Sequence, residues 1–175
     1  MKKIIFCFIF LFTIFNSQNL SATTLKDSVN HSERSEKNVL RDKFRNPLET
    51  LKFFEIEPSM TIIELSPGNG WYTEILSTYL YNQGKLIAAA YDPNLSDYAK
   101  RSREAYERKL KSKEIYNKVE IVNLFSKLSD DGSIDAILTY RNVHNWIGED
   151  GSGVKKVFQQ AYSSLKPGGI LGIVE

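Results

Sequence analysis

The sequence predicts an α/β fold, in which a mainly parallel sheet carries helices on both faces. Two observations predict it: short apolar runs alternate with amphipathic segments from residue 61 onward, and a glycine-rich loop follows the first run. Short apolar runs of this kind are typical of strands that are buried on both faces. Strands that alternate with helices require right-handed crossover connections, which produce a parallel sheet.

Residues 1–22 are predicted to be a secretory signal peptide that is removed from the mature protein. Lys2 and Lys3 form a basic start, residues 4–15 form an apolar run, and Ala22 supplies a small side chain for cleavage. The run is shorter than the roughly 20 residues that a membrane span needs, although a retained N-terminal anchor is the alternative. We therefore expect an exported, periplasmic protein with no stable membrane span after processing.

Composition narrows the classes of site and partner. Cys7 is the single cysteine and lies in the predicted signal peptide, so the mature chain would contain no disulfide, catalytic thiol or cysteine-bound metal. Without Lys2 and Lys3 the 23 basic residues become 21, which equals the 21 acidic residues. A near-neutral chain without a basic stripe predicts no nucleic-acid partner. We expect a small-molecule substrate and no metal.

Two segments precede the main domain, which is expected at residues 61–175. Residues 23–38 are predicted to be a polar linker, because they contain mostly polar and charged residues. Residues 39–60 are predicted to form a helical cap, which Pro47 divides into two short helices. The apolar residues at helical spacing in this cap are Leu40, Phe44, Leu48, Leu51 and Phe54.

Strands and helices are then expected to alternate. The apolar runs predict strands at 61–65, 85–91, 119–122, 134–140 and 169–174. Helices are predicted at 71–81, 97–113 and 153–165. The predicted buried stripe of the second helix is Tyr98, Ala105, Tyr106 and Leu110, and that of the third is Val154, Val157, Phe158, Ala161, Tyr162 and Leu165. The mixed charges of residues 100–113 predict a solvated helix face rather than a binding patch.

The loop after the first strand is the predicted binding site, because ligands of parallel sheets bind beyond the carboxyl ends of the strands. It reads Glu64-Leu65-Ser66-Pro67-Gly68-Asn69-Gly70-Trp71-Tyr72. Gly68 and Gly70 allow the backbone to approach a ligand closely, and the next helix offers free backbone N–H groups. Glu64 would repel a pyrophosphate, so its charge predicts a cationic ligand.

Asp92 follows the second strand, 22 residues after Gly70. A carboxylate at that strand tip can accept hydrogen bonds from both hydroxyls of a ribose. The sequence Asp92-Pro93-Asn94 is also typical of a turn, since all three residues favour turns. A ribose contact and a turn are therefore both compatible with this aspartate.

Two segments resemble motifs of class I methyltransferases that use S-adenosyl-L-methionine (SAM). Residues 64–76 (E-L-S-P-G-N-G-W-Y-T-E-I-L) resemble the first motif of that class, and residues 161–174 (A-Y-S-S-L-K-P-G-G-I-L-G-I-V) resemble its fifth-strand motif. More narrowly, residues 41–54, 67–76 and 139–146 are similar to a family of predicted bacterial methyltransferases with N-terminal signal peptides.

This resemblance covers residues 41–175 and implies a Rossmann-like, doubly wound sheet with strand order 3-2-1-4-5 and SAM as the cofactor. Glu64 suits the sulfonium and the α-ammonium of SAM. The usual sheet of seven strands has two more strands, so we expect the C-terminal part to be missing. Ser66 stands where the common motif has glycine. The expected cofactor-binding residues are Glu64, Ser66, Pro67, Gly68, Gly70, Tyr72, Asp92 and Tyr140.

The segment after the fourth strand should lie opposite the methyl group. His144, one of two histidines in the chain, is the candidate catalytic base, unless it only bonds neighbouring backbone. Asn142 and Asn145 are candidates to orient a polar substrate atom. Trp146 is expected to contact the sulfonium by cation–π attraction or simply to pack.

Arg41 and Arg45 are candidates for a lid that holds the cofactor carboxylate or a substrate acid, with surface solvation as the alternative. A nicotinamide dinucleotide is disfavoured, because Thr73 stands at the third glycine of the Gly-x-Gly-x-x-Gly fingerprint. The sequence thus predicts a methyltransferase for an unknown small molecule. Its competitors are an exported SAM-like nucleoside-binding module and a truncated remnant without catalysis.

Overall fold

The computed structural model describes residues 23–148 and 150–175. The predicted signal peptide, residues 1–22, lies outside the described residues. Among the helices that are described, none combines the length and the apolarity that crossing a membrane requires.

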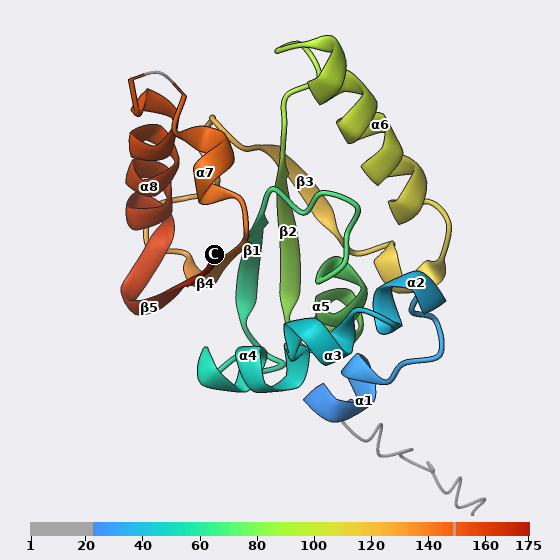
Figure 1. Ribbon diagram of the computed structural model, residues 1–175. Helices are drawn as coiled ribbons and strands as arrows, with labels where there is room; N and C mark the ends of the chain where they lie inside the picture. Colours follow the sequence, from blue (N-terminus) through green and yellow to red (C-terminus); the bar gives the residue numbers. More distant parts are fainter. Residues whose placement is uncertain (1–22, 149) are drawn as a thin grey trace, which may run out of the picture.

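A five-stranded, all-parallel sheet forms the centre of the domain, in the order β3-β2-β1-β4-β5 (Figure 1). Its strands are β1 (Thr61–Leu65), β2 (Lys85–Ala90), β3 (Glu120–Asn123), β4 (Ile134–Tyr140) and β5 (Leu165–Val174). The predicted fold class and strand order are confirmed. The strand order reverses between β1 and β4, so their carboxyl ends open a crevice where a ligand can bind.

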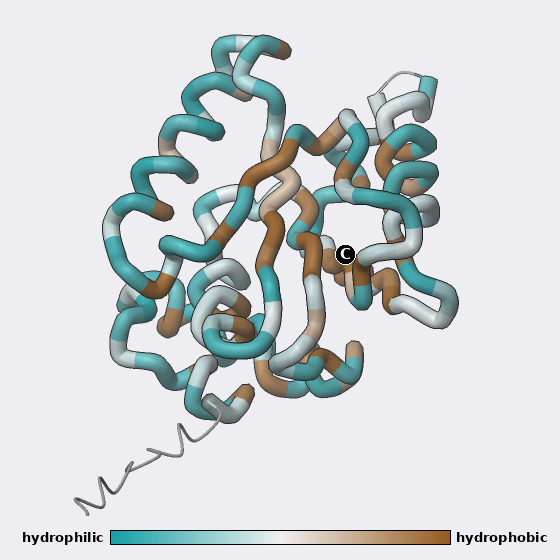
Figure 2. The backbone as a smooth tube through the Cα atoms, turned by 180° about the vertical axis from the view of Figure 1, so that it is seen from behind, coloured by the Kyte–Doolittle hydropathy of each residue, from teal (hydrophilic) through white to brown (hydrophobic). Residues whose placement is uncertain are grey.

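Both faces of the sheet are covered by helices. Neighbouring residues of a strand point to opposite sides, so they show which helices cover each face. Ile62 and Ile63 of β1 are both fully buried, but they belong to different core clusters. The Ile62 cluster contains α5 (Thr73–Leu80), and the Ile63 cluster contains residues of α7 (Val143–Trp146) and α8 (Ser152–Ser164). The strands accordingly appear as apolar segments inside the domain in Figure 2.

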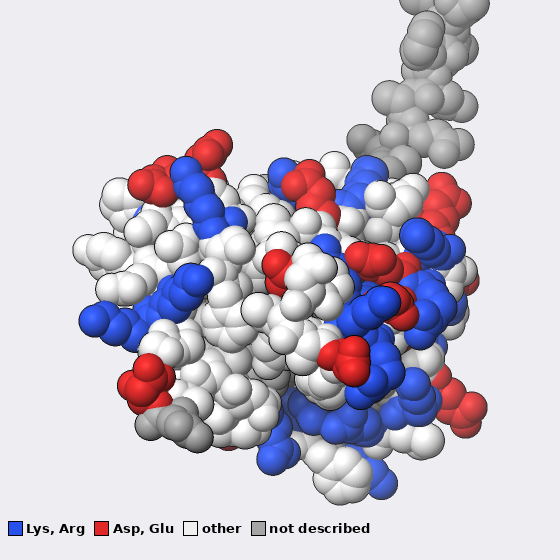
Figure 3. Space-filling model, turned by 90° about the horizontal axis from the view of Figure 1, so that it is seen from above, with Lys and Arg blue, Asp and Glu red and all other residues white. Residues whose placement is uncertain are grey.

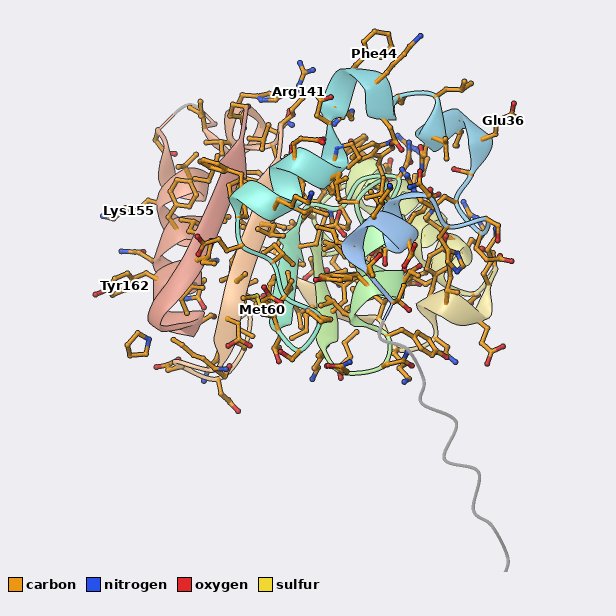
Figure 4. All side chains as sticks on the ribbon, turned by 90° about the horizontal axis from the view of Figure 1, so that it is seen from below. Glu36, Phe44, Met60, Arg141, Lys155 and Tyr162 are labelled. Atoms are coloured by element: carbon orange, nitrogen blue, oxygen red, sulfur yellow. The ribbon has the colours of Figure 1, made fainter. Side chains whose placement is uncertain are left out.

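The remaining crossover helix, α6 (Asp97–Leu110), follows β2 and is capped by Ser96, whose Oγ accepts from the Ala99 backbone N–H. Three residues of the predicted stripes are exposed instead of buried: Ala105, Tyr98 at 66% and Tyr162 at 85%. Tyr162 lies on the outer side of α8, away from the sheet (Figure 4). The α7 helix was not predicted, since four residues are too few to show a helical period.

The N-terminal residues 23–38 are not the polar linker that their composition predicted. They contain α1 (Leu25–Val29) and α2 (Glu36–Val39), and they are followed by α3 (Asp42–Arg45) and α4 (Pro47–Phe53). Pro47 begins α4, so the predicted division of the cap into two short helices is confirmed. The linker prediction failed because this polar segment packs on the domain through ion pairs and hydrogen bonds as well as through Val29, which joins the core.

A buried ion-pair network attaches these helices to the domain. The Arg34 guanidinium donates to both oxygens of Asp42, at 2.6 and 2.9 Å. Glu74 of α5, which is 1% exposed, accepts from Lys109 Nζ at 2.6 Å and from Ser35 Oγ at 2.8 Å. Burial opposes ionisation of this carboxyl, but its hydrogen bonds outweigh burial and lower the pKa of Glu74. The network therefore joins α2, α3, α5 and α6.

Replacing Glu74 by Gln should lower the free energy of unfolding by roughly 2 kcal/mol, because Lys109 and Arg34 would lose their shared counter-charge. Urea unfolding followed by circular dichroism measures this change. Glu120→Gln is the matched control, since the Lys85–Glu120 pair is exposed and contributes less than about 1 kcal/mol. Equal losses in the two variants would contradict the structural role of Glu74.

Candidate functional site

The loop between β1 and α5 lies at the crevice and has an unusual backbone. Ser66, Gly68 and Gly70 have φ angles of 49°, 58° and 71°. A Cβ on Gly68 would meet no atom within 4 Å, so this residue faces open space. A Cβ on Gly70 would lie 2.8 Å from the Lys109 side chain. Gly68 therefore leaves room for a ligand, whereas Gly70 leaves room for the protein itself.

Glu64 of β1 is a buried carboxyl group beside this loop. It is 2% exposed and accepts a hydrogen bond of 2.6 Å from Thr73 Oγ1, which lies 3.0 Å from Tyr106 Oη. Burial raises the pKa of Glu64 to about 7, although the Thr73 hydrogen bond and the positive charge of Lys109 oppose that rise. A cation placed near Glu64 would favour its ionised form.

Two cavities meet on the loop. The first, here called the α6 cavity, has a volume of about 450 Å³ and lies between the loop, the ends of β2 and β3, and α6. It is lined by Ser66, Pro67, Gly68, Ala90, Tyr91, Leu95, Ser96, Tyr98, Ala99, Ser102, Tyr106, Phe125, Asn142 and Asn145. Aromatic and aliphatic side chains with a few hydroxyls and amides can hold a flat, weakly polar group.

The second cavity, here called the α3 cavity, has a volume of about 330 Å³. It is lined by Lys37, Asn38, Arg41, Arg45, Glu64, Ser66, Pro67, Gly68, Asn69, Trp71, Tyr140 and Asn142. Four of these residues, Ser66, Pro67, Gly68 and Asn142, also line the α6 cavity. The α3 cavity thus combines a buried acid with basic side chains, and Figure 3 shows Lys and Arg gathered on one side of the molecule.

Tyr140, the last residue of β4, has a hydroxyl that lacks a partner. Its ring stacks on Tyr72 with 3.4 Å between the centroids, and its Oη is buried without a hydrogen bond among the described residues. Burial, followed by the nearby Tyr72 and Glu64, raises the pKa of Tyr140 well above its usual value. Tyr140 is therefore a neutral hydroxyl that a ligand oxygen or nitrogen could satisfy.

The segment after β4 supports the loop. Asn142 Nδ2 lies 3.2 Å from the Ser66 carbonyl and 3.1 Å from the Tyr140 carbonyl, so it joins the ends of β1 and β4. Asn145 lines the α6 cavity. Trp146 is buried and donates from Nε1 to Ser66 Oγ at 3.2 Å, and it lines neither cavity. The packing role is thus the one observed for Trp146.

Four predicted site residues line neither cavity: Gly70, Tyr72, Asp92 and His144. His144 is an exposed side chain whose Nδ1 lies 2.9 Å from Glu175 Oε2. Asp92 Oδ1 accepts from the backbone and side-chain nitrogens of Asn94, each at 2.9 Å, and Asp92 Oδ2 accepts from Asn123 at 3.3 Å. The structure therefore shows Asp92 in its turn role and gives His144 no position for proton transfer in either cavity.

Several lining residues were not predicted as part of the site. Tyr98, at the start of α6, and Phe125, after β3, line the α6 cavity, and Tyr106 and Thr73 reach Glu64 through a hydrogen-bonded chain. The aromatic spacing of α6 predicted burial and not a cavity wall. Among the described residues, no group of three or more His, Cys, Asp or Glu side chains could hold a metal ion.

Comparison with known proteins shows the family and related folds. Residues 63–173 match a family model described as a methyltransferase domain. No curated protein matches the chain. A SAM-dependent methyltransferase from Aquifex aeolicus has a similar structure, with a TM-score of 0.53 and 22% identity over 73% of this chain and 62% of that one.

Two further solved structures share the fold. A proposed SAM-dependent methyltransferase from Methanococcus maripaludis has a TM-score of 0.52 and 21% identity over 89% of this chain and 67% of that one. The cyclase SpnF has a TM-score of 0.54 and 14% identity over 75% of this chain and 43% of its own. The chain thus spans about two thirds or less of the length of these relatives.

Proposed function

The chain belongs to the methyltransferase domain family, for which SAM is the implied cofactor, and we propose that it transfers the SAM methyl group to a small-molecule acceptor. The observation that carries this proposal is the pair of cavities that meet on residues 66–68. One cavity has aromatic and aliphatic walls, which suit adenosine. The other has a carboxyl group and basic side chains, which suit a zwitterionic amino acid.

Three features of the site fit this cofactor. Gly68 leaves open space where the two cavities meet, so a long ligand can cross the loop. Glu64 is buried with a raised pKa, and the ammonium and sulfonium would favour its ionised form. The buried Tyr140 hydroxyl is an unsatisfied donor in the wall of the α3 cavity.

We assign the binding roles from these positions. Glu64 would receive the cationic groups, and Arg41 and Arg45 would receive the α-carboxylate. Ser66, Pro67 and Gly68 would form the floor beneath the cofactor. Tyr72 would act indirectly by stacking on Tyr140. Gly70 would act indirectly too, because its missing side chain leaves space for Lys109 to pack on the loop.

The chemistry requires little from the protein beyond positioning. When bound, SAM supplies an electrophilic methyl carbon that bonds to an acceptor lone pair as the carbon–sulfur bond breaks and S-adenosylhomocysteine leaves. The high pKa of Tyr140 makes it a hydrogen-bond donor and not a base. His144 lines neither cavity, so we propose an acceptor that needs no base from this chain; Asn142 would hold the ends of β1 and β4 in place, and Asn145 would line the α6 cavity.

Calorimetric titration of S-adenosylhomocysteine into the protein tests the proposal. We expect one site per chain and release of labelled product from SAM when a small-molecule library is added. Absence of binding would refute the proposal. Binding without turnover on any acceptor would favour the nucleoside-binding module, and the structural likeness to a cyclase shows that this fold is found with another activity.

Asp92 provides a separate test of the proposed ribose contact. Asp92→Ala should lower the affinity for S-adenosylhomocysteine by about tenfold if the carboxylate leaves its Asn94 turn to accept hydrogen bonds from the ribose hydroxyls. Asn94→Ala is the matched control, because it removes the side-chain amide and keeps the carboxylate. Equal losses in both variants would show that Asp92 acts only through the turn.

We also propose that the protein is exported and that residues 1–22 are removed. Support comes from the basic start and the apolar run alone. N-terminal sequencing of the protein from separated bacterial fractions tests this proposal. A periplasmic protein that begins near Thr23 is expected, and a cytoplasmic protein that retains Met1 would contradict export.

A further inference from the structure

We infer that the methyl acceptor is a small anion, which Arg41, Arg45 and Arg141 hold in a third cavity beside the Tyr72–Tyr140 stack. This inference rests on the proposed methyltransferase function. It assigns a substrate class to the cavity that Arg141 lines, which lies next to the proposed cofactor contacts of Arg41 and Arg45.

The third cavity, here called the acceptor cavity, has a volume of about 340 Å³ and lies at the ends of β4 and β5, against α3. It is lined by Arg41, Phe44, Arg45, Tyr72, Tyr140, Arg141, Val174 and Glu175. Figure 4 shows Phe44 and Arg141 on the same side of the molecule, although they come from α3 and from the loop after β4. Tyr140, Arg41 and Arg45 also line the α3 cavity, so the two cavities are neighbours.

The three arginines form a cationic cluster without counter-charges of their own. Among the described residues, none of them is within an ion pair. Partial burial, followed by repulsion from Arg41 and Arg141, lowers the pKa of Arg45. Arg45 is held in place over the Trp71 ring, with its guanidinium carbon 5.3 Å from the ring centroid. Neighbouring cations that repel one another bind an anion favourably.

The cofactor would neutralise only part of this cluster, because Arg41 and Arg45 would share its one carboxylate and Arg141 lines neither cofactor cavity. SAM has a single carboxylate but two cationic centres, so its binding raises the positive charge of the region. Glu175 is the carboxyl side chain that lines the acceptor cavity, and it already accepts from the Val143 backbone N–H and contacts His144 Nδ1. An anionic acceptor would supply the missing negative charge.

The same cavity also offers surface for an apolar body. Phe44 is exposed, and Val174 and the stacked pair of Tyr72 and Tyr140 form further walls. The Tyr140 hydroxyl, buried without a partner, can donate to a polar atom of the acceptor. The chemistry that fits is a carboxylate or a phosphate ester on a small hydrophobic group.

Calorimetry with three matched probes tests the inference on protein saturated with S-adenosylhomocysteine. Phenylacetate and phenyl phosphate carry the anion, and phenylacetamide is the neutral isostere of the first. We expect the preferred anion to bind at least about tenfold more tightly than the amide. Comparison of the two anions shows whether the site takes a carboxylate or a phosphate ester.

Arg141 distinguishes the acceptor from the cofactor, because it lines the acceptor cavity and neither of the other two. Arg141→Gln should lower the affinity for the anion by about tenfold, while the affinity for S-adenosylhomocysteine changes by less than about threefold. Arg141→Lys should recover part of the lost anion affinity. Arg101→Gln, at an exposed position of α6, controls for net charge. Thermal melting verifies that each variant is folded.

The outcomes separate the two proposals. No binding of S-adenosylhomocysteine would refute the proposed function. Normal binding of S-adenosylhomocysteine with equal affinity for anion and amide would overturn only the anionic acceptor, as would equal anion affinities in Arg141→Gln and Arg101→Gln.

Discussion

Gly68→Leu should abolish detectable binding of S-adenosylhomocysteine, a loss of at least about 100-fold. Gly68 is the one glycine of the loop that lines both the α6 cavity and the α3 cavity, and a Cβ at this position would project into open space. A leucine side chain would therefore occupy the volume that the cofactor needs and would not displace protein atoms. Calorimetry and thermal shift with S-adenosylhomocysteine measure the loss.

Gly132→Leu is the matched control for backbone strain. Gly132 has φ 62°, close to the 58° of Gly68, and a Cβ at Gly132 also meets nothing within 4 Å. Both variants should lose roughly 1–2 kcal/mol of stability, because each places an L-residue in the left-handed region. Gly132 precedes β4 and so lies at the amino ends of the strands, whereas the cavities lie at the carboxyl ends. Gly132→Leu should therefore bind S-adenosylhomocysteine normally. Normal binding by Gly68→Leu would refute the site.

Glu64→Gln should stabilise the free protein and weaken its cofactor binding at pH 8. Burial raises the pKa of Glu64 to about 7 from 4.5, so the fold prefers the protonated carboxyl. The neutral amide of glutamine keeps the shape of that group and removes the titration. At pH 8 it also removes the negative charge that attracts the ammonium and the sulfonium. The affinity for S-adenosylhomocysteine should therefore fall by about tenfold, and the affinity for SAM by more.

The pH dependence of stability follows from the raised pKa of Glu64 in the folded protein. The stability that Glu64 contributes is fully present below pH 4.5, decreases between pH 4.5 and about 7, and is lost above that range. A shift of this size corresponds to roughly 3 kcal/mol in the wild-type protein. Cofactor affinity should change in the opposite sense and rise as the pH increases through about 7.

Urea unfolding and calorimetry from pH 5 to pH 9 test both parts of this prediction. The wild-type protein and Glu64→Gln should converge in stability at low pH and diverge above neutrality. Glu104→Gln, at an exposed position of α6, is the control for removal of one acidic charge. Parallel pH profiles of the wild-type protein and Glu64→Gln would contradict the role assigned to Glu64.

The sheet could be predicted because its signals are local. β1 and β4 have the predicted bounds, since each is a short apolar run between polar segments. β5 begins at Leu165 and not at residue 169, because Leu165 already pairs with Ile134 of β4; the register then shifts before Ile170 pairs with Ala136, and Gly168 in between has a φ of 80°. Predictions for the N-terminal residues failed where burial depends on partners that are distant in sequence, as for Arg34 and Glu74.

For the site, the order of residues along the chain was sufficient to place Glu64, Ser66 and Gly68 together. A strand end followed by a turn into a helix forces these residues to the carboxyl edge, whatever the rest of the fold does. His144 was expected in the same crevice but lines neither cavity, because its position after β4 does not specify the direction of its side chain. The α7 turn directs it toward Glu175.

Hydrophobic periodicity and loop chemistry, which are properties of neighbouring residues, were therefore enough to establish the α/β class and the acidic glycine loop. The resemblance to class I methyltransferases supplied the strand order. Packing between distant segments alone created the Tyr72–Tyr140 stack, the chain from Glu64 through Thr73 to Tyr106, and the arginines beside the acceptor cavity. Those contacts depend on how helices and strand ends meet in space, and no local pattern encodes such distances.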